Sequence, residues 1–289
     1  MKTEGRRESE NVEDRRGQGG RMPMGRAGVG GLGLIAIVVL SLIFGVDPRQ
    51  FLGQLEEQQP GADTAPGRPY QESAEEAKRR SFIKVVLADT EDVWSAIFKA
   101  SGKTYEQPTL VLFSGLVQSD CGTAQSAAGP FYCPRDHKVY LDLSFYDEMA
   151  GKLGAGGDFA FAYVVAHEVG HHVQTLLGTS AKVQAARQQA SEEESNGLSV
   201  RLELQADCLA GVWAMHTENQ KHVLEQGDIE EAMGAAAAVG DDRLQKAAQG
   251  YVVPETFTHG SAAQRAKWFR EGLQSGDPNK CDTFGVKDL

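Results

Sequence analysis

Positive charge is scarce in most of this 289-residue chain. Lys and Arg number 29 against 40 Asp and Glu, which gives a formal net charge of −11. Residues 1–26 hold seven Lys or Arg and five Asp or Glu, a net charge of +2, so residues 27–289 carry −13. A protein that binds DNA or RNA needs a basic surface to meet the phosphates. The composition therefore excludes nucleic acid as the expected partner.

Charged residues are missing altogether between Gly28 and Val46, where the sequence reads GVGGLGLIAIVVLSLIFGV. A helix of this length would be roughly 28 Å long, close to the thickness of the hydrocarbon layer of a bilayer. A buried core helix and a cleaved signal peptide are the alternatives. The small-x-small pattern at which a signal peptide is cut is also absent, since the run ends Phe44-Gly45-Val46-Asp47-Pro48. We therefore expect an uncleaved transmembrane helix at 28–46.

The residues around this run predict the topology. Seven Lys or Arg precede it, whereas only Arg49 follows closely. By the positive-inside rule, the N-terminus should be cytoplasmic and the large C-terminal part should lie outside, in a single-pass arrangement. Residues 1–27 are polar and are predicted to be a disordered cytoplasmic tail. Residues 47–71 are rich in Pro, Gly and Gln and are predicted to be a linker, so that one folded domain occupies 72–289.

Cysteine is rare, and no two cysteines have the C-x-x-C spacing of a thiolate metal site. The four cysteines all fall in the predicted outer domain: Cys121, Cys133, Cys208 and Cys281. An even number in an oxidising compartment predicts two disulfides, for which three pairings exist. We favour Cys121–Cys133 as a local loop closure and Cys208–Cys281 as a tie on the C-terminal tail.

Periodicity predicts a mainly helical domain with a small sheet, an α+β fold. The sequence shows no internal repeat. Short apolar or alternating runs at 109–113 and 138–143 are typical of strands. Helices are expected at 73–100, 159–177, 192–216 (with Gly197 as a weak point), 228–249 and 261–273.

The helix predicted at 159–177 carries the sequence His167-Glu168-Val-Gly-His171. Residues four apart lie on one helix face, so both imidazoles can reach one ion. Glu168 lies at the rim of that face, where a carboxylate can take a proton from an attacking water. Zn²⁺ suits nitrogen and oxygen ligands and makes water a nucleophile at neutral pH. The alternative, two solvated histidines on a polar face, fits poorly with the apolar residues on both sides.

A catalytic zinc site needs a third protein ligand. The metzincin pattern would place Gly and His where Gln174 and Leu177 stand, and is excluded. The gluzincin pattern, a Glu on a second helix, is met by Glu203, 32 residues after His171. Asp207 lies one turn further on the same face and is expected to accept the N–H of a ligand histidine. The alternative role for Glu203 is an ion pair with Arg201 or with a neighbouring helix.

Five segments together resemble the neutral zinc metallopeptidases of the YpfJ type, a bacterial family with an N-terminal membrane segment. They are GPFYCPRDHKVYLDLSF (129–145), AYVVAHEVGHHVQ (162–174), RLELQADCLAGVWA (201–214), AVGDDRLQ (238–245) and THGSAAQR (258–265). The chain is more distantly similar to HtpX-type gluzincins, in which a His-Pro element and an Arg six residues later line the active site. Here His259 and Arg265 have that spacing, with Gly260 in place of Pro.

The resemblance implies a gluzincin-like fold and two further roles. His259 would stabilise the oxyanion, or else be an ordinary histidine at a helix start. The strand at 138–143 would be an edge strand that pairs with the substrate backbone. His172 lies about 140° round the helix from His167 and is expected to be structural.

The sequence thus predicts a membrane-anchored endopeptidase that binds one Zn²⁺ through His167, His171 and Glu203 and uses Glu168 as general base. Its partner would be a protein or peptide substrate. Two alternatives stay open: an inactive, zinc-stabilised scaffold or binding protein of the envelope, and a non-peptidase metallohydrolase of the cell wall. The sequence does not predict the oligomeric state.

Overall fold

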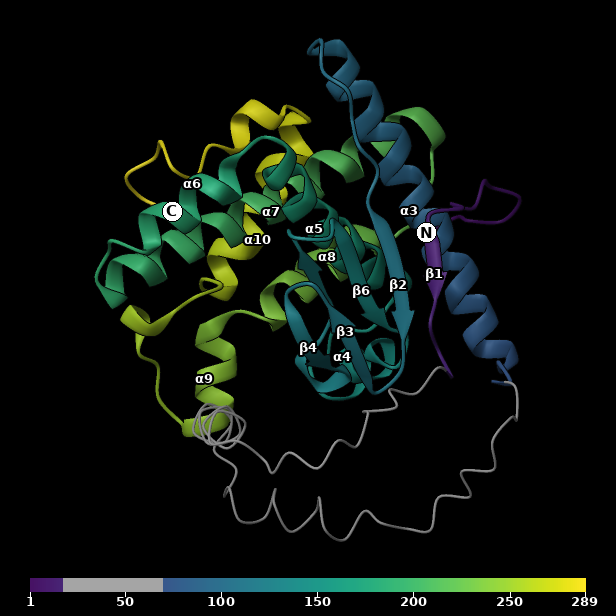
Figure 1. Cartoon of the computed structure of the whole chain (residues 1–289), viewed down its shortest axis with the longest axis horizontal. Helices are drawn as coiled ribbons and strands as arrows, with labels where there is room; N and C mark the ends of the chain where they lie inside the picture. The colour runs from purple at the N-terminus through teal and green to yellow at the C-terminus, as the bar shows by residue number, and fades with distance from the viewer. Residues whose placement is uncertain (18–69) are drawn as a thin grey trace, which may run out of the picture.

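The computed structural model describes residues 1–17 and 70–289, which form a mainly helical α+β domain (Figure 1). The strands are β1 (Val12–Asp14), β2 (Thr109–Phe113), β3 (Leu116–Ser119), β4 (Gly122–Gln125), β5 (Phe131–Cys133) and β6 (Lys138–Asp142). The α-helices are α3 (Ala74–Ala100), α4 (Phe145–Gly151), α5 (Asp158–Leu176), α6 (Thr179–Arg187), α7 (Glu192–Lys221), α8 (Asp228–Ala238), α9 (Asp241–Gln249) and α10 (Ala262–Ser275). The fold class predicted from the sequence is confirmed.

A four-stranded sheet of order β1-β2-β6-β5 forms one side of the domain. β1, β2 and β6 are parallel, with Leu110 opposite Val139 in the register of β2 and β6, while β5 runs antiparallel to β6. The apolar run of β2 is typical of a strand that is buried on both faces. β3 and β4 form a separate hairpin.

Helix α5 runs through the centre of the domain and packs against α7, α8, α3 and the sheet. It is apolar nearly all round, as expected of a helix with neighbours on every side. Helices α7 and α10 each begin with a capping box, Ser191 with Glu194 and Ser261 with Gln264, which satisfies the first free N–H groups of the helix.

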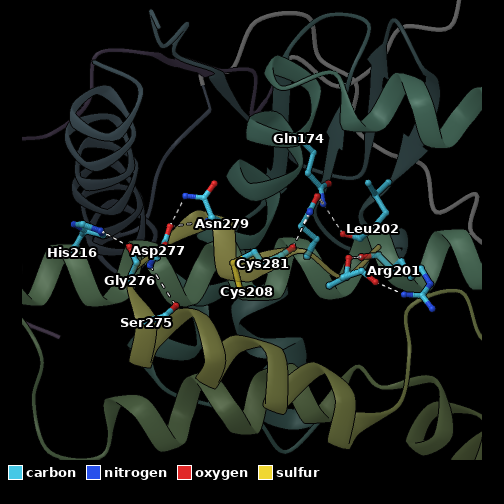
Figure 2. Close-up of a disulfide and its surroundings, with 12 residues drawn as sticks. Gln174, Arg201, Leu202, Cys208, His216, Ser275, Gly276, Asp277, Asn279 and Cys281 are labelled. Carbon is cyan, nitrogen blue, oxygen red and sulfur yellow. Dashed lines mark hydrogen bonds between the residues drawn. A yellow bond between two sulfur atoms is a disulfide. The ribbon is translucent and has the colours of Figure 1, made fainter. Parts of the chain in front are cut away.

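Helices α7 and α10 cross with their backbones in contact. A Cβ added at Gly272 would lie 1.8 Å from the carbonyl oxygen of Cys208, so only glycine fits there. The Cys208–Cys281 disulfide joins α7 to the chain just beyond α10 (Figure 2), and Cys121–Cys133 closes the loop that runs from the turn between β3 and β4 to the end of β5. Both predicted disulfide pairings are confirmed.

Two of the helix predictions need correction. The single helix predicted at 228–249 is two helices, because the chain turns at Val239 and Gly240 between α8 and α9. Helix α7 runs on to Lys221 and is unbroken at Gly197, since the tertiary packing of the helix outweighs the weak propensity of one glycine.

The prediction that residues 1–27 form a disordered tail is wrong for residues 1–17. β1 is a parallel strand of the main sheet, and the Ser9 side chain is fully buried. Arg6 and Arg7 of this segment ion-pair with acidic residues of α3, for example Arg7 Nη1 with Glu91 Oε2 at 2.9 Å. The charges that made the segment look solvated are satisfied by complementary charges that lie far away in the sequence.

The predicted transmembrane helix at 28–46, and all but the last two residues of the predicted linker, lie outside the described residues. Among the helices of 1–17 and 70–289, none combines the length and the apolar character needed to cross a bilayer.

Candidate metal centre

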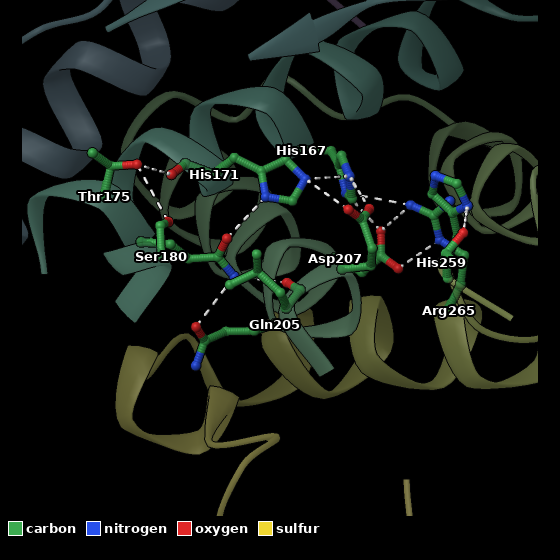
Figure 3. A network of polar contacts seen from close by, with 12 residues as sticks. His167, His171, Thr175, Ser180, Gln205, Asp207, His259 and Arg265 are labelled. Atoms are coloured by element: carbon green, nitrogen blue, oxygen red, sulfur yellow. Dashed lines mark hydrogen bonds and ion pairs between the residues drawn. The ribbon is translucent and has the colours of Figure 1, made fainter. Parts of the chain in front are cut away.

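Helices α5 and α7 bring the three predicted ligands together. The ligand atoms of His167, His171 and Glu203 all lie within 4.8 Å of one another. The two Nε2 atoms are 3.2 Å apart, and Glu203 Oε2 lies 3.2 Å from His167 Nε2. His167 and His171 lie side by side in Figure 3, with Asp207 below His167. The three side chains thus converge on one point from two helices.

Close packing of the two helices makes this convergence possible. A Cβ added at Gly170, between the two histidines, would lie 3.0 Å from the carbonyl oxygen of Ala206 on α7. A larger side chain at Gly170 would push the helices apart and move Glu203 away from the imidazoles. The geometry of the site therefore requires glycine at position 170, although the helix itself does not.

The donor set and its charge fit Zn²⁺. Two imidazole nitrogens and one carboxylate are the ligands of a His₂Glu catalytic zinc site, which leaves one position open. Burial lowers the pKa of His167, but the charge of Asp207 outweighs this and, together with Glu203, raises the pKa to about 10. The pKa of Glu203 is held well below its usual value by the two histidines despite burial. The pocket therefore favours a cation.

The part of the chain that the structure describes holds only one other cluster of this kind, Asp158 with Asp228 and Glu231. It offers carboxylates alone, and the N-terminal amine of Met1 forms ion pairs with Asp158 and Asp228. The amine compensates part of its charge, and its oxygen ligands do not favour zinc.

Asp207 orients His167 and is itself fully enclosed. Its Oδ1 lies 2.8 Å from His167 Nδ1 and accepts further hydrogen bonds from the Tyr163 hydroxyl and from Arg265 Nη2, the latter at 2.9 Å. Arg265 Nε donates to Oδ2 at 2.8 Å. Burial raises the pKa of Asp207, but Arg265 and His167 outweigh it and lower the pKa overall. A permanent carboxylate thus holds one tautomer of His167, as second-sphere carboxylates do at zinc sites.

His171 has a different partner, which the sequence analysis did not identify. Its Nδ1 lies 2.8 Å from Oε1 of Gln174, a residue with no exposed surface. The Gln174 amide nitrogen donates to the carbonyl oxygen of Leu202 at 2.7 Å, which Figure 2 shows beside the disulfide. The only signal in the sequence was the spacing of three residues from His171.

Glu168 and His259 line one cavity of about 1060 Å³ together with the three candidate ligands. Glu168 is 8% exposed. The His259 side chain is 52% exposed, with Nδ1 3.2 Å from Oδ1 of Asp241. That hydrogen bond raises the pKa of His259 above its usual value. The cavity thus places a carboxylate, and a histidine that favours its cationic form, around the candidate metal position.

The prediction of an edge strand at 138–143 is wrong in its position. β6 lies inside the sheet, between β2 and β5, and the outer strand beside α5 is β5. Phe131 and Tyr132 of β5 line the cavity. The alternating pattern of β6 reflects burial of the strand, which a sequence cannot distinguish from an edge position.

His172 points away from the cluster, as its place on the helix predicted. Its Nδ1 lies 3.0 Å from the Tyr132 hydroxyl, and its Nε2 lies 2.6 Å from the carbonyl oxygen of Glu106. Burial lowers the pKa of His172 to about 4, so this imidazole is neutral. It joins α5 to β5 and to the loop before β2.

Fold and site together define a mainly helical domain with a His₂Glu set at its centre that could hold a metal ion. The chain belongs to the family described as "Putative neutral zinc metallopeptidase", whose profile matches residues 1–284. It is 52% identical to the uncharacterized protein YpfJ of Escherichia coli strain K12 over 291 residues, 99% of each chain. It is 44% identical to the uncharacterized protein Rv2575 of Mycobacterium tuberculosis over 263 residues, 86% of each chain. No solved structure matches the chain.

Proposed function

We propose that this protein is a zinc-dependent endopeptidase of gluzincin type. The observation that carries the proposal is the convergence of His167, His171 and Glu203 on one point beside a carboxylate, Glu168, that lines the same cavity. Membership of a zinc metallopeptidase family supports the same conclusion. Protein or peptide chains are the proposed substrates.

In the proposed reaction, the zinc ion, two side chains and one strand have separate roles. Zinc held by the three ligands would polarise the scissile carbonyl and make the attacking water more acidic. Glu168 accepts a proton from that water and passes it to the nitrogen of the leaving amine. His259, at the rim of the cavity, donates to the developing oxyanion. The outer strand β5 offers its free edge to the backbone of an extended substrate.

The first test is metal content in the full-length protein. We expect about one zinc per chain by elemental analysis, and weaker binding or loss in His167→Ala and Glu203→Ala. Zinc retained in Glu203→Ala would move the third ligand elsewhere. No zinc in a folded wild type, even after zinc is added, would overturn the proposal.

The second test separates binding from chemistry. Glu168→Gln should keep zinc but lose about 10²–10⁴-fold of the hydrolysis of an unfolded protein, because an amide cannot accept the proton. Glu193→Gln, in the exposed acidic start of α7, is the matched control and should behave as wild type. Full activity in Glu168→Gln would refute the mechanism.

Two other functions give different results in the same assays. A scaffold would bind zinc but cleave neither peptide nor cell-wall material. A structural zinc site is also closed by its protein ligands, whereas the three candidate ligands here line a cavity. A cell-wall hydrolase would cleave murein and leave unfolded protein intact. Cleavage of peptide bonds is the outcome that the proposal requires.

Membrane attachment through Gly28–Val46 is part of the proposal, and its support is the uncharged 19-residue run in the sequence. Recovery of the full-length protein in the membrane fraction, and release into the soluble fraction when 28–46 is deleted, would test it.

A further inference from the structure

We propose that Gln174 is a positioning residue that fixes the tautomer and orientation of His171. The inference rests on the proposed zinc site and deepens it. A histidine that binds metal through Nε2 carries its proton on Nδ1, and a partner for that proton fixes the ring. Gln174 Oε1, at 2.8 Å from His171 Nδ1, is the acceptor in this position.

The other end of the same side chain is also held. Gln174 Nε2 donates to Leu202 O at 2.7 Å and to Gln205 Oε1 at 3.2 Å, both on α7. Donation to two oxygens identifies the nitrogen and leaves the amide oxygen to face His171. Since Glu203 follows Leu202 directly, one buried amide links the second histidine to the helix that supplies the third ligand.

The chain provides a control that separates positioning from packing. Gln205 accepts a hydrogen bond from Gln174 and donates to the carbonyl oxygen of Cys281 at 2.9 Å. Among the described residues, it forms no hydrogen bond with either ligand histidine. Gln205→Leu therefore removes a structural bridge and leaves the acceptor for His171 in place. Gln174→Leu removes both.

The experiment is zinc affinity by chelator competition on full-length protein, with thermal unfolding of the apo form alongside. Gln174→Leu should weaken zinc binding about 10–100-fold, as loss of an orienting partner does at other zinc sites. Gln174→Glu keeps the acceptor oxygen for His171 but loses the donor to Leu202 O, so its zinc affinity should fall by less than that of Gln174→Leu. Gln205→Leu should stay within a few-fold of wild type even where its unfolding temperature falls.

Three results would overturn the inference: unchanged affinity in Gln174→Leu, an equal loss in Gln205→Leu, or a full loss in Gln174→Glu. If Gln174→Leu does not fold, Gln174→Glu and Gln205→Leu still decide between positioning and packing. Failure of the wild type to bind zinc would refute the proposed function instead, so the two failures are distinguishable.

A second, independent observation concerns the side of the membrane on which the two described parts lie. We infer that residues 1–17 and 70–289 lie on the same side. β1 pairs with β2 along its whole length, Val12 opposite Leu110 and Asp14 opposite Leu112, and strands of one sheet cannot be separated by a bilayer. The single transmembrane helix predicted at 28–46 would place them on opposite sides in either orientation.

The ends of the undescribed segment support this inference. Gly17 and Tyr70 are in contact, since a Cβ added at Gly17 would lie 2.3 Å from Tyr70 Cβ. Arg16 Nη2 lies 2.7 Å from Glu72 Oε1, so an ion pair joins the two sides of the gap. The chain therefore leaves the domain and returns to it at one place.

The described residues contain no free cysteine, which allows single-cysteine labelling in intact cells. Glu10→Cys and Lys103→Cys place thiols at exposed positions in the two parts. A membrane-impermeant maleimide should label both or neither, and both should react in purified, detergent-solubilised protein. Labelling of one and protection of the other would overturn the inference.

Discussion

The two histidines of the candidate metal centre are held in opposite ways. His167 rests on Asp207, a buried carboxylate whose charge is balanced by Arg265 from α10. His171 rests on Gln174, a neutral amide from its own helix. One side of the site is an ion network that involves three helices, and the other is a local contact on α5 that reaches α7 through hydrogen bonds (Figure 3).

The two sides of the site therefore depend on different kinds of interaction. A buried ion pair is stable only while both partners are present, because removal of one leaves an unpaired charge in a low-dielectric interior. A neutral hydrogen bond has a smaller cost when it is broken. The His167 side should therefore affect the stability of the fold as well as metal affinity, whereas changes on the His171 side should affect mainly metal affinity.

Removal of Arg265 is expected to have the largest effect and tests whether the His167 side controls stability. Arg265→Leu leaves Asp207 buried without its cation and should cost about 3–5 kcal/mol in the free energy of unfolding. Chemical denaturation of the full-length protein measures it. Arg270→Leu, at an exposed position of the same helix, is the control and should change stability by less than about 0.5 kcal/mol. Equal effects in the two variants would show that α10, rather than the ion network, is what matters.

Asp207→Asn tests how much the His167 side contributes to zinc affinity, compared with the His171 side. Asparagine keeps the shape of the side chain but removes the charge that favours the Nδ1 proton of His167. Zinc affinity should fall about 10–100-fold. We expect a larger loss than in Gln174→Leu, because the lost acceptor is charged. Chelator competition on both variants measures the ratio, and a smaller loss at Asp207 would reverse the ranking of the two sides.

The smallest expected effect lies at the rim, where His259 meets Asp241. The hydrogen bond with Asp241 raises the pKa of His259, so the folded state favours the protonated imidazole. Its stabilisation is fully present below the unfolded pKa of about 6.5 and is lost as pH rises through the raised pKa. The difference in melting temperature between wild type and His259→Gln should therefore shrink above neutral pH. A constant difference would contradict this expectation.

The sequence predicted the parts of the site that depend on helix spacing. His167 and His171 are one turn apart on α5, and Glu203 and Asp207 are one turn apart on α7, so each pair is visible in the sequence alone. Tyr163 and Gln174 lie at helical spacings from the same histidines, but nothing in the sequence tells which polar side chains meet once α5 packs on α7. The contact of Arg265 with Asp207 is a tertiary one, and the spacing from His259 only hinted at it.

The strand order of the sheet and the strand near the N-terminus were harder to predict, because they too depend on tertiary contacts. The order of strands is set by tertiary contacts, so the place of β6 inside the sheet and of β5 outside it left no local signal. β1 contains Val, Glu and Asp, a composition that does not suggest a strand. Its two acidic side chains are compensated by cations, Glu13 by Lys138 of β6 and Asp14 by Arg16.

The crossing of α10 over α7 has a consequence for the order of events in synthesis. His167, His171, Glu203 and Asp207 leave the ribosome before α10, yet the cation that balances Asp207 is Arg265, and Cys208 finds its partner only at Cys281. A nascent chain that ends before residue 265 holds the ligands without the ion network that fixes them. The candidate metal centre would thus be completed only after α10 has been synthesised.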